Sequence, residues 1–542
     1  MKRRKKGNRP VLPVRDMPAA ELFAIVDRAQ HEPLTDDERA LLKAVIETLY
    51  MMTEEVAAKN ASMLRLKCIL FGATTEKTGE VLGDGGEKPT TNLTKKPEKR
   101  QGHGRNGAAA YVGASRVKMP HAEIKHGDSC PDCGHGRVYE QAKPAELIRI
   151  VGMAPMNATV YECERLRCNG CGKVFTASAP AGVGEKKYDE SVAAMIAMFK
   201  YGCGVPFHRL EKFQAGLGVP LPAGTQWDLI EAAVEQVEPA FEELVRQAAQ
   251  GDVLHNDDTA MKILGFDVDV LTETRVEAKT RTGIFTSGII AKAKERVMAL
   301  FFTGHNHAGE NLAAVLARRE ADLTSPIQMC DALSRNTKGD FKTILGNCLA
   351  HARRKFVEVV ENFPEECRRV LETLRDVYHN DEVAREEKLS PEARLLLHQE
   401  KSEPLMKDLE AWLREQVEER KVEPNSTLGE AITYMQNHWA ELTLFLRQPG
   451  APLDNNICER ALKKAILHRK NALFYKTENG ARVGDMFMSL IHTAELNKAN
   501  PFDYLIALQR HSTSVKSQPA DWLPWNYRAA LAAIASGPGP PG

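Results

Sequence analysis

GDVLHNDDTAMKIL, at residues 251–264, is the segment around which the rest of this chain is organised. It has the composition of a β-strand and carries two adjacent aspartates, Asp257 and Asp258. More apolar runs of strand length follow, and the last of them ends directly before Asp331. A long charged region of helical pattern then precedes a helix that carries Glu459. The expected strands cover 253–264, 283–291, 297–303 and 326–330, and the expected helical region covers 352–445.

The bulk composition limits the classes of protein to consider. The chain has 542 residues, too many for one compact core, so several domains are expected. It has no apolar run of about 18 residues and no apolar segment of a secretory signal behind MKRRKKGNRP, so we expect a cytoplasmic protein without a membrane partner. Its 73 basic and 73 acidic residues balance, so any contact with nucleic acid must come from local clusters.

The N-terminal part holds two such clusters and a heptad pattern. Lysine and arginine are dense in residues 2–9 and 95–125, and each segment is read either as a DNA contact or as a solvated tail. Between them, residues 36–71 predict a helix with apolar residues every seven positions, from Leu42 to Leu70. That seam packs either against a partner helix, as a short coiled coil, or onto its own domain.

Four of the eleven cysteines form two Cys-x-x-Cys pairs that are separated by 34 residues. Each pair places two thiolates on one tight turn, and two pairs complete a tetrahedral sulfur site that suits Zn²⁺ and leaves no open position for catalysis. We therefore predict a zinc-ribbon-like module with one structural Zn²⁺. The predicted ligands are Cys130, Cys133, Cys168 and Cys171.

Residues 206–234 have the pattern of a helix-turn-helix, with glycines between two short helices. The second helix is acidic at Asp228 and Glu231, so phosphate contacts would have to come from the first helix. The segment is read either as a DNA-reading module or as a plain helical connector.

Asp257, Asp331 and Glu459 stand out by context. Two follow apolar strand runs, and the third lies near the start of a helix that Asn455 or Asn456 can cap. Adjacent strand ends, with a helix packed over the sheet, bring such carboxylates together. Hard oxygen ligands bind Mg²⁺ or Mn²⁺, and a two-metal carboxylate cluster suits phosphoryl transfer on nucleic acids. Each aspartate is equally a candidate turn residue, and Asp258 competes with Asp257 for the first position.

Six motifs occur in order along most of the chain and together resemble the IS66 family of insertion-sequence transposases. The motifs are CPDCG (130–134), HNDDTAMKIL (255–264), CLAHARRKF (348–356), PLDNNICERALKK (452–464), RKNALF (469–474) and NPFDYL (500–505). Where this family usually has glutamate, the chain has Asp258.

The resemblance implies a multidomain α+β and α/β protein with an RNase H-like core, a helical insertion, the zinc-ribbon-like module and the coiled-coil-like helix. It implies that Asp257, Asp331 and Glu459 are the catalytic acids of a DDE transposase and bind Mg²⁺ or Mn²⁺. Arginines of CLAHARRKF, together with His351, either contact DNA or form a helix face paired with the insertion. The DNA-binding residues expected from the motifs are Arg353, Arg354, Arg460, Lys463, Arg469 and Lys470.

The expected segments follow from these features. They are the basic N-terminus with the leucine-rich helix (1–72), a flexible basic linker (73–119), the zinc module (120–178), a helical segment with the helix-turn-helix pattern (179–250), the first part of the core (251–356), the insertion (357–445), the return to the core with Glu459 and a C-terminal block (446–510), and a C-terminal tail (511–542).

The expected function is metal-dependent cleavage and transfer of DNA strands at the ends of an insertion sequence. The expected partners are end and target DNA, further copies of the chain, and small accessory proteins of the same element; the protein would be nucleoid-associated when on DNA. Two other functions fit the same features. One is a zinc-containing DNA-binding protein whose catalysis has decayed, and the other is a structure-specific nuclease of the RNase H fold.

Overall fold

The computed structural model describes residues 25–29, 33–43, 45, 78–81, 117, 122–133, 135–139, 154–167, 174–178, 180, 186–265 and 283–536. Its contacts divide the chain into two units, one made of 1–85 with 162–542 and the other of 86–161. Most of the expected heptad seam, the basic N-terminus, and Cys168 and Cys171 lie outside the described residues. Among the helices of the described ranges, none is long and apolar enough to cross a membrane.

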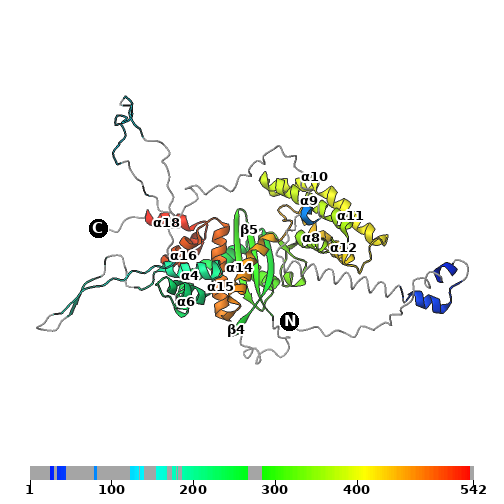
Figure 1. The fold of residues 1–542 in the computed structure, drawn as a ribbon, viewed down its shortest axis with the longest axis horizontal. Coiled ribbons are helices and arrows are strands. Elements are labelled where there is room, and N and C mark those ends of the chain that lie inside the picture. The colour runs from blue at the N-terminus through cyan, green and yellow to red at the C-terminus, as the bar shows by residue number, and fades with distance from the viewer. Residues whose placement is uncertain are drawn as a thin grey trace. The chain divides into compact units, whose positions relative to one another are not determined.

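A five-stranded mixed sheet forms the centre of the larger unit (Figure 1), and its strand order is β6-β5-β3-β7-β8. The middle strand pairs antiparallel with β5, which pairs antiparallel with β6. On its other side it pairs parallel with β7, which pairs parallel with β8. The strands expected from the sequence are confirmed, and β8 is an additional one. Their bounds are β3 Val253–Met261, β5 Ile284–Ala293, β6 Arg296–Gly304, β7 Ile327–Cys330 and β8 Ile344–Asn347.

Helices cover both faces of this sheet. A Cβ on Gly288 of β5 would lie 3.0 Å from Leu462, so this face carries α14 (Asn456–Ala472). The neighbouring Ser287 accepts a 2.8 Å hydrogen bond from Asn311, so the opposite face carries α7 (Ala308–Leu316). Alternation along a strand thus places consecutive β5 residues against different helices. Beyond α14, the short strands β4 (Ile263–Gly265) and β9 (Tyr475–Thr477) pair in parallel. Helix α15 (Glu478–Leu496) packs on β6.

The expected helical insertion is a bundle whose core is continuous with one side of the sheet. Buried residues of β3 and β7, Val253 and Ile327, belong to the same apolar cluster as Leu349 and Phe356 of the first helix after the sheet. Figure 1 shows the helices of this bundle gathered beside the sheet. Proline in the first turn begins three of them and serine caps two of them. They are α8 Leu349–Val357, α9 Pro364–Glu386, α10 Pro391–Lys401, α11 Glu403–Glu418, α12 Thr427–Asn437 and α13 Trp439–Leu442.

The chain enters and leaves this bundle at one place. The backbone N–H of Leu349, the first residue of α8, donates a 3.0 Å hydrogen bond to the carbonyl of Leu453, just before α14. The sheet strands before the bundle and the helix that carries Glu459 therefore stay close in space, although a whole helical bundle separates them in sequence.

A second group of helices packs beside β6. Its long helix, α6, contacts helices of the C-terminal block. Where the sequence suggested a C-terminal tail, the structure has two further helices, with Val515 and Trp522 buried. The segments 512–517 and 527–535 are too short for helical periodicity to stand out in the sequence. The group comprises α4 Glu190–Ala197, a π-helix Met198–Gly202, α5 Phe207–Gly216, α6 Ala223–Ala248, α16 Pro501–Arg510, α17 Ser512–Ser517 and α18 Tyr527–Ala535.

Candidate active site and metal-binding residues

The two adjacent aspartates of β3 point to opposite faces of the sheet. Asp258 lies on the α7 face, where its carboxylate accepts a 2.8 Å hydrogen bond from His307 and lies 3.3 Å from Nε of Arg335. Its side chain is 1% exposed. Asp257 lies on the face that carries α14, where its backbone neighbour across the sheet is Gly288. Strand alternation therefore separates the two candidates for the first acid.

Asp257 and Asp331 are brought together by one buried amide. Nδ2 of Asn336 donates to Oδ1 of Asp331 and, at 3.4 Å, to Oδ1 of Asp257. Burial and the negative charge of Asp331 raise the pKa of Asp257 to about 7. Two carboxylates that share one donor and repel each other in this way form a site that favours a bound cation.

A network of buried amides fixes Asn336. Its backbone carbonyl accepts hydrogen bonds from Asn256 Nδ2, at 2.9 Å, and from Gln328 Nε2, at 2.8 Å. Gln328 also donates to Oδ1 of Asn256, at 3.0 Å. All three side chains are buried, so their polar groups are held in one arrangement by each other. The turn after β7 is thereby tied to β3, and its asparagine is aimed at both aspartates.

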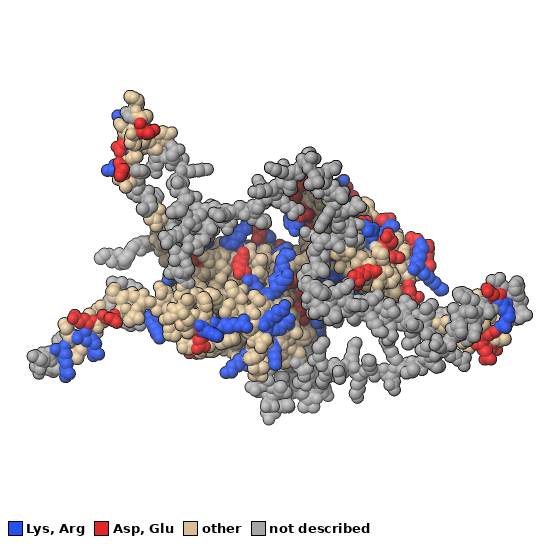
Figure 2. Space-filling model, in the orientation of Figure 1, with Lys and Arg blue, Asp and Glu red and all other residues tan. Residues whose placement is uncertain are grey.

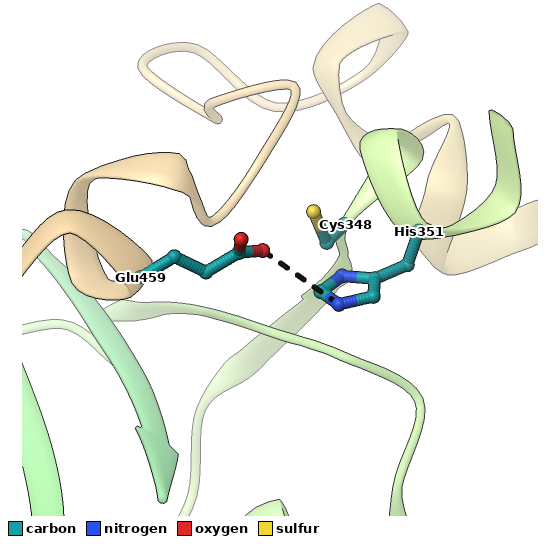
Figure 3. A group of neighbouring side chains, drawn as sticks. All are labelled: Cys348, His351 and Glu459. Carbon is teal, nitrogen blue, oxygen red and sulfur yellow. Dashed lines mark ion pairs between the residues drawn. The ribbon is translucent and has the colours of Figure 1, made fainter. Parts of the chain in front are cut away.

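Glu459, in the first turn of α14, lies beside α8 (Figure 3). Its Oε1 is 3.6 Å from Nε2 of His351. Among the described residues, the group of metal-ligand side chains whose donor atoms all lie within 4.8 Å of one another is Cys348, His351 and Glu459. The structure thus brings Asp257 to Asp331, and Glu459 to a cysteine and a histidine.

Asn455 fixes the start of α14 against the sheet. It occupies the N-cap position, but its side chain bonds to β3 instead of capping the helix: Oδ1 lies 3.1 Å from Nδ1 of His255, and Nδ2 donates to the carbonyl of Asn256 at 3.1 Å. Its backbone N–H donates to Sγ of Cys348 at 3.2 Å. One buried residue therefore sets the position of Glu459 relative to the strand that carries Asp257.

Two buried cysteines, Cys330 and Cys458, directly precede Asp331 and Glu459 in the sequence. Cys458 donates from Sγ to the carbonyl of Gly288 at 3.3 Å, and burial together with the charges of Asp257 and Glu459 raises its pKa well above the usual range. Burial and then the charges of Asp331 and Asp257 raise the pKa of Cys330 as well. The charges of Asp257 and Glu459 thus both act on Cys458, and those of Asp331 and Asp257 both act on Cys330.

The insertion reaches the acids through α12. Burial and the charge of Asp331 raise the pKa of Tyr434 to about 12. Nζ of Lys355, from α8, lies 4.5 Å from the centre of the Tyr434 ring. The side chain of Asp331 is therefore bordered by the helical insertion as well as by the sheet.

The expected DNA-binding residues of α14 divide into two kinds. Arg460, Lys463 and Lys470 are exposed and lie on one helix face, whereas Nη1 of Arg469 donates to Thr259 Oγ1 at 3.1 Å and to a β3 carbonyl. Figure 2 shows basic side chains over the region where Figure 1 places α14 and the sheet. We call the exposed residues Arg460, Lys463 and Lys470 the α14 basic stripe.

Arg353 and Arg354 line a cavity of about 750 Å³ between α8 and α9. α9 adds two more arginines to it, and Asn456 at the start of α14 borders it. Two acidic residues of α9 are also present, so the cavity is not uniformly basic. Its lining includes Arg375, Asp376, His379, Glu382 and Arg385.

The structure describes two of the four predicted zinc ligands. Cys130 and Cys133 lie on one tight turn in the smaller unit, closed by a 2.7 Å hydrogen bond from the Cys130 N–H to the carbonyl of Gly136. Backbone N–H groups of Gly136 and His135 lower the pKa of Cys133. In the larger unit, the two-stranded pair β1 (Arg165–Arg167) and β2 (Val174–Thr176) brackets the second cysteine pair in sequence. The complete four-cysteine site remains a prediction.

The helix-turn-helix pattern corresponds to α5 and α6. Gln226 of α6 donates to the carbonyls of Phe207, at 3.1 Å, and Leu221, at 2.9 Å, which fixes the turn between the helices. α6 is much longer than a recognition helix needs to be, and its buried face packs within the larger unit. DNA reading by this segment remains a prediction.

Three residues that lie close to the acids were not assigned to the site from the sequence. They are Asn336, Cys348 and His351. For His351 the signal was present, since CLAH has the Cys-x-x-His spacing that puts two ligands on one helical turn. Asn336 had no such signal, because its role depends on a turn that folds back onto β3.

Part of the chain matches a family of known proteins, and relatives of the whole chain are also known. Residues 186–483 match the transposase IS66 family, and they include all three acids. Uncharacterized protein y4jD of Sinorhizobium fredii is 26% identical over 535 residues, which cover 92% of this chain and 98% of that relative. Uncharacterized protein y4hP of the same organism is 26% identical over 433 residues, which cover 77% of this chain and 76% of the relative. Because the family match spans more than half of the chain, the protein belongs to the IS66 family of transposases, and this membership indicates an enzyme that acts on DNA in transposition.

Proposed function

We propose that this protein is a DDE transposase with an RNase H-like core. The support for the core is its sheet, in which three antiparallel strands are followed by two strands parallel to the first. That order of strands is typical of RNase H-like folds, and one fold can serve many different functions. The proposed DDE chemistry therefore depends on the side chains at the centre of the sheet.

The observation that carries the proposal is the pair Asp257 and Asp331, joined by Asn336, on the sheet face over which α14 places Glu459. The donor set fits Mg²⁺ or Mn²⁺, because it offers hard carboxylate oxygens and because Asp257 and Asp331 lie close enough to share the donor Asn336. Asp257, Asp331 and Glu459 would hold the ions. Such ions, when bound, lower the barrier for displacement at phosphorus by stabilising the attacking and leaving oxygens.

The protein's own groups position the acids and the DNA. Asn336 holds two carboxylates in place, and Asn455 holds the helix that carries the third. The α14 basic stripe and the arginines of the α8–α9 cavity lie on either side of Glu459 in sequence and fit the role of phosphate contacts, which orient DNA without reading its sequence.

Two successive in-line displacements follow from this arrangement. Water first attacks a phosphodiester at an element end, and the 3′-oxygen leaves as a hydroxyl. That 3′-hydroxyl then attacks a phosphodiester of target DNA, whose own 3′-oxygen leaves. No covalent bond between protein and DNA is needed, so no serine or tyrosine nucleophile is assigned.

Strand cleavage and transfer on element-end DNA with Mg²⁺ or Mn²⁺ tests the proposal. Asp331→Asn and Glu459→Gln are expected to abolish both steps, whereas the exposed Asp340→Asn serves as a matched control and keeps them. Full activity of either acid variant would refute the triad. End binding without any cleavage would instead favour a decayed DNA-binding protein, and cleavage of branched DNA of any sequence without transfer would favour a nuclease.

Two further parts of the proposal lie in the N-terminal half. We propose that Cys130, Cys133, Cys168 and Cys171 hold one structural Zn²⁺, supported by the tight turn around Cys130 and by the β1–β2 pair. Pairing of two element ends also calls for more than one copy of the chain, and the heptad seam is the proposed contact; accessory proteins of the element are further proposed partners. Metal analysis and the mass of the purified protein test both parts.

A further inference from the structure

A second group of potential metal ligands adjoins the proposed magnesium site. Cys348 occupies the N-cap position of α8 and His351 lies in its first turn, three residues later. Both face Glu459 of α14, and the three donor atoms lie within 4.8 Å of one another (Figure 3). Nδ1 of His351 and Oε1 of Glu459 are buried and have no hydrogen-bond partner among the described residues.

The chemistry of this group differs from that of the aspartate pair. A thiolate and an imidazole are softer ligands than carboxylates, and together with one carboxylate they suit Zn²⁺ rather than Mg²⁺. The N–H of Asn455 donates to Sγ of Cys348, at 3.2 Å, and such a bond stabilises the sulfur when it carries negative charge. The three ligands come from two helix starts that Asn455 already holds in register.

We propose that Cys348, His351 and Glu459 form a binding site for Zn²⁺ or a similar transition-metal ion. Binding replaces the thiol proton of Cys348, which is released to solvent, and no group is oxidised or reduced. Because Glu459 belongs to both ligand sets, the ion draws this carboxylate away from the aspartate pair. Zn²⁺ therefore inhibits the enzyme by competing for one shared ligand; this regulatory part depends on the proposed function, whereas the binding site itself does not.

Cobalt binding tests the site without any use of DNA. Co²⁺ bound to a cysteine sulfur gives a strong charge-transfer absorption, so titration of the full chain with Co²⁺ reports both stoichiometry and sulfur ligation. We expect Cys348→Ser to bind one equivalent less than the wild type, with a matching loss of absorption. Cys203→Ser, which alters an exposed cysteine outside the group, is the control and binds as the wild type does.

If Cys348→Ser does not fold, His351→Gln is the second variant that tests the site. The histidine side chain is only partly buried, so we expect its replacement to leave the fold intact. This variant is expected to lose the same equivalent of Co²⁺. Equal Co²⁺ stoichiometry and absorption in the wild type and in His351→Gln would overturn the proposed site.

The inhibition is measured on Mg²⁺-supported cleavage. The Zn²⁺ concentration that halves the rate is expected to rise with Mg²⁺ in the wild type and to be at least about tenfold higher in His351→Gln, since a lost metal ligand weakens binding by such factors. Equal sensitivity of the two proteins would overturn the regulatory role. A chain that binds Co²⁺ through Cys348 but cleaves no DNA would instead count against the proposed function alone.

Discussion

Asp257 and Asp258 are consecutive residues of β3, and their carboxylates lie on opposite faces of the sheet. Asp258 is enclosed between His307 and Arg335, near the start of α7. Asp257 shares the donor Asn336 with Asp331, on the face covered by α14. Of the two aspartates, the one that faces Glu459's helix is therefore the better candidate for the first catalytic acid.

This relationship gives a prediction for the two aspartates. Asp257→Asn is expected to abolish DNA cleavage and to keep the fold. Asp258→Asn removes a buried charge from Arg335 and is expected to lower the free energy of unfolding by about 1–3 kcal/mol, while cleavage persists below its melting temperature. Urea unfolding and an end-cleavage assay separate the effects. Inactive Asp258→Asn beside active Asp257→Asn would reverse the assignment.

Asn336 gives a second prediction. Replacing it with alanine removes the donor that joins Asp257 and Asp331, and outer residues of this kind change metal affinity or activity by about 10-fold to 100-fold. We expect Asn336→Ala to need correspondingly more Mg²⁺ for half-maximal cleavage. Asn311→Ala, which alters an asparagine on the opposite sheet face, is the control. Equal Mg²⁺ dependence in both variants would show that Asn336 does not position the acids.

Much of this arrangement was predictable from local pattern. Strand-length apolar runs predicted β3, β5, β6 and β7, and of the two cap candidates before Glu459, Asn455 and Asn456, the first holds the N-cap position. The choice between Asp257 and Asp258 was not predictable, because alternation says only that they differ in direction and not which face α14 covers. β8 escaped notice because only two of its four residues, Ile344 and Leu345, are apolar, and the other two are Gly346 and Asn347.

Gly288 gives a third prediction. A Cβ there would lie 3.0 Å from Leu462 and 3.5 Å from Sγ of Cys458, both on α14. Gly288→Ala is therefore expected to push the helix off the sheet, to lower the free energy of unfolding by about 1–3 kcal/mol and to reduce cleavage. Gly304→Ala at the end of β6 is the control, since a Cβ there meets nothing within 4 Å. Identical stability and cleavage in the two variants would contradict close α14 packing.

The α14 basic stripe gives a fourth prediction. If Arg460 and Lys463 each neutralise one phosphate, the double alanine variant binds end DNA more weakly, and the slope of log affinity against log salt becomes shallower by about 2. Lys464→Ala is the matched control, because Lys464 pairs with Glu495 at 2.9 Å and its side chain is only 18% exposed. Fluorescence anisotropy over a salt series measures both slopes. A double variant with the wild-type slope would remove the stripe from the DNA path.

Asp485 gives a fifth prediction, about pH. It is buried in α15, where Thr303 donates to it from N, at 2.6 Å, and from Oγ1, at 2.7 Å, and burial raises its pKa to about 7. The folded chain therefore holds this proton more tightly than the unfolded chain between about pH 4 and 7. The contribution of Asp485 to stability should fall with rising pH across that window, by at most about 1.4 kcal/mol per unit, and this cost is complete above pH 7.

Thermal unfolding between pH 5 and 8 tests this prediction. Asp485→Asn should show a flatter dependence than the wild type, because the amide cannot titrate. Asp503→Asn, at an exposed position of α16, is expected to leave the wild-type curve unchanged. Equal pH dependence in the wild type and in Asp485→Asn would contradict the assigned proton.

The side chains around Glu459 show why a site is harder to predict than a fold. Asn455 was one of two residues expected to cap α14. Its side chain instead bonds to His255 and to the carbonyl of Asn256, which lie 200 and 199 positions away in the sequence. Cys348 and His351 meet Glu459 only because α8 and α14 start at the same place. Periodicity and capping describe residues that are close in sequence. They therefore do not predict contacts between residues that are far apart in sequence.

The hydrogen bond between Leu349 and Leu453 has a consequence for how this enzyme can vary. The helical insertion between these residues begins and ends at this one hydrogen bond. The number and length of its helices can therefore change without moving Glu459 relative to β3. Related proteins can then have longer, shorter or different insertions, as long as the apolar face of α8 still covers Val253 and Ile327. The same property makes the insertion a suitable place for grafting a reporter domain onto the enzyme.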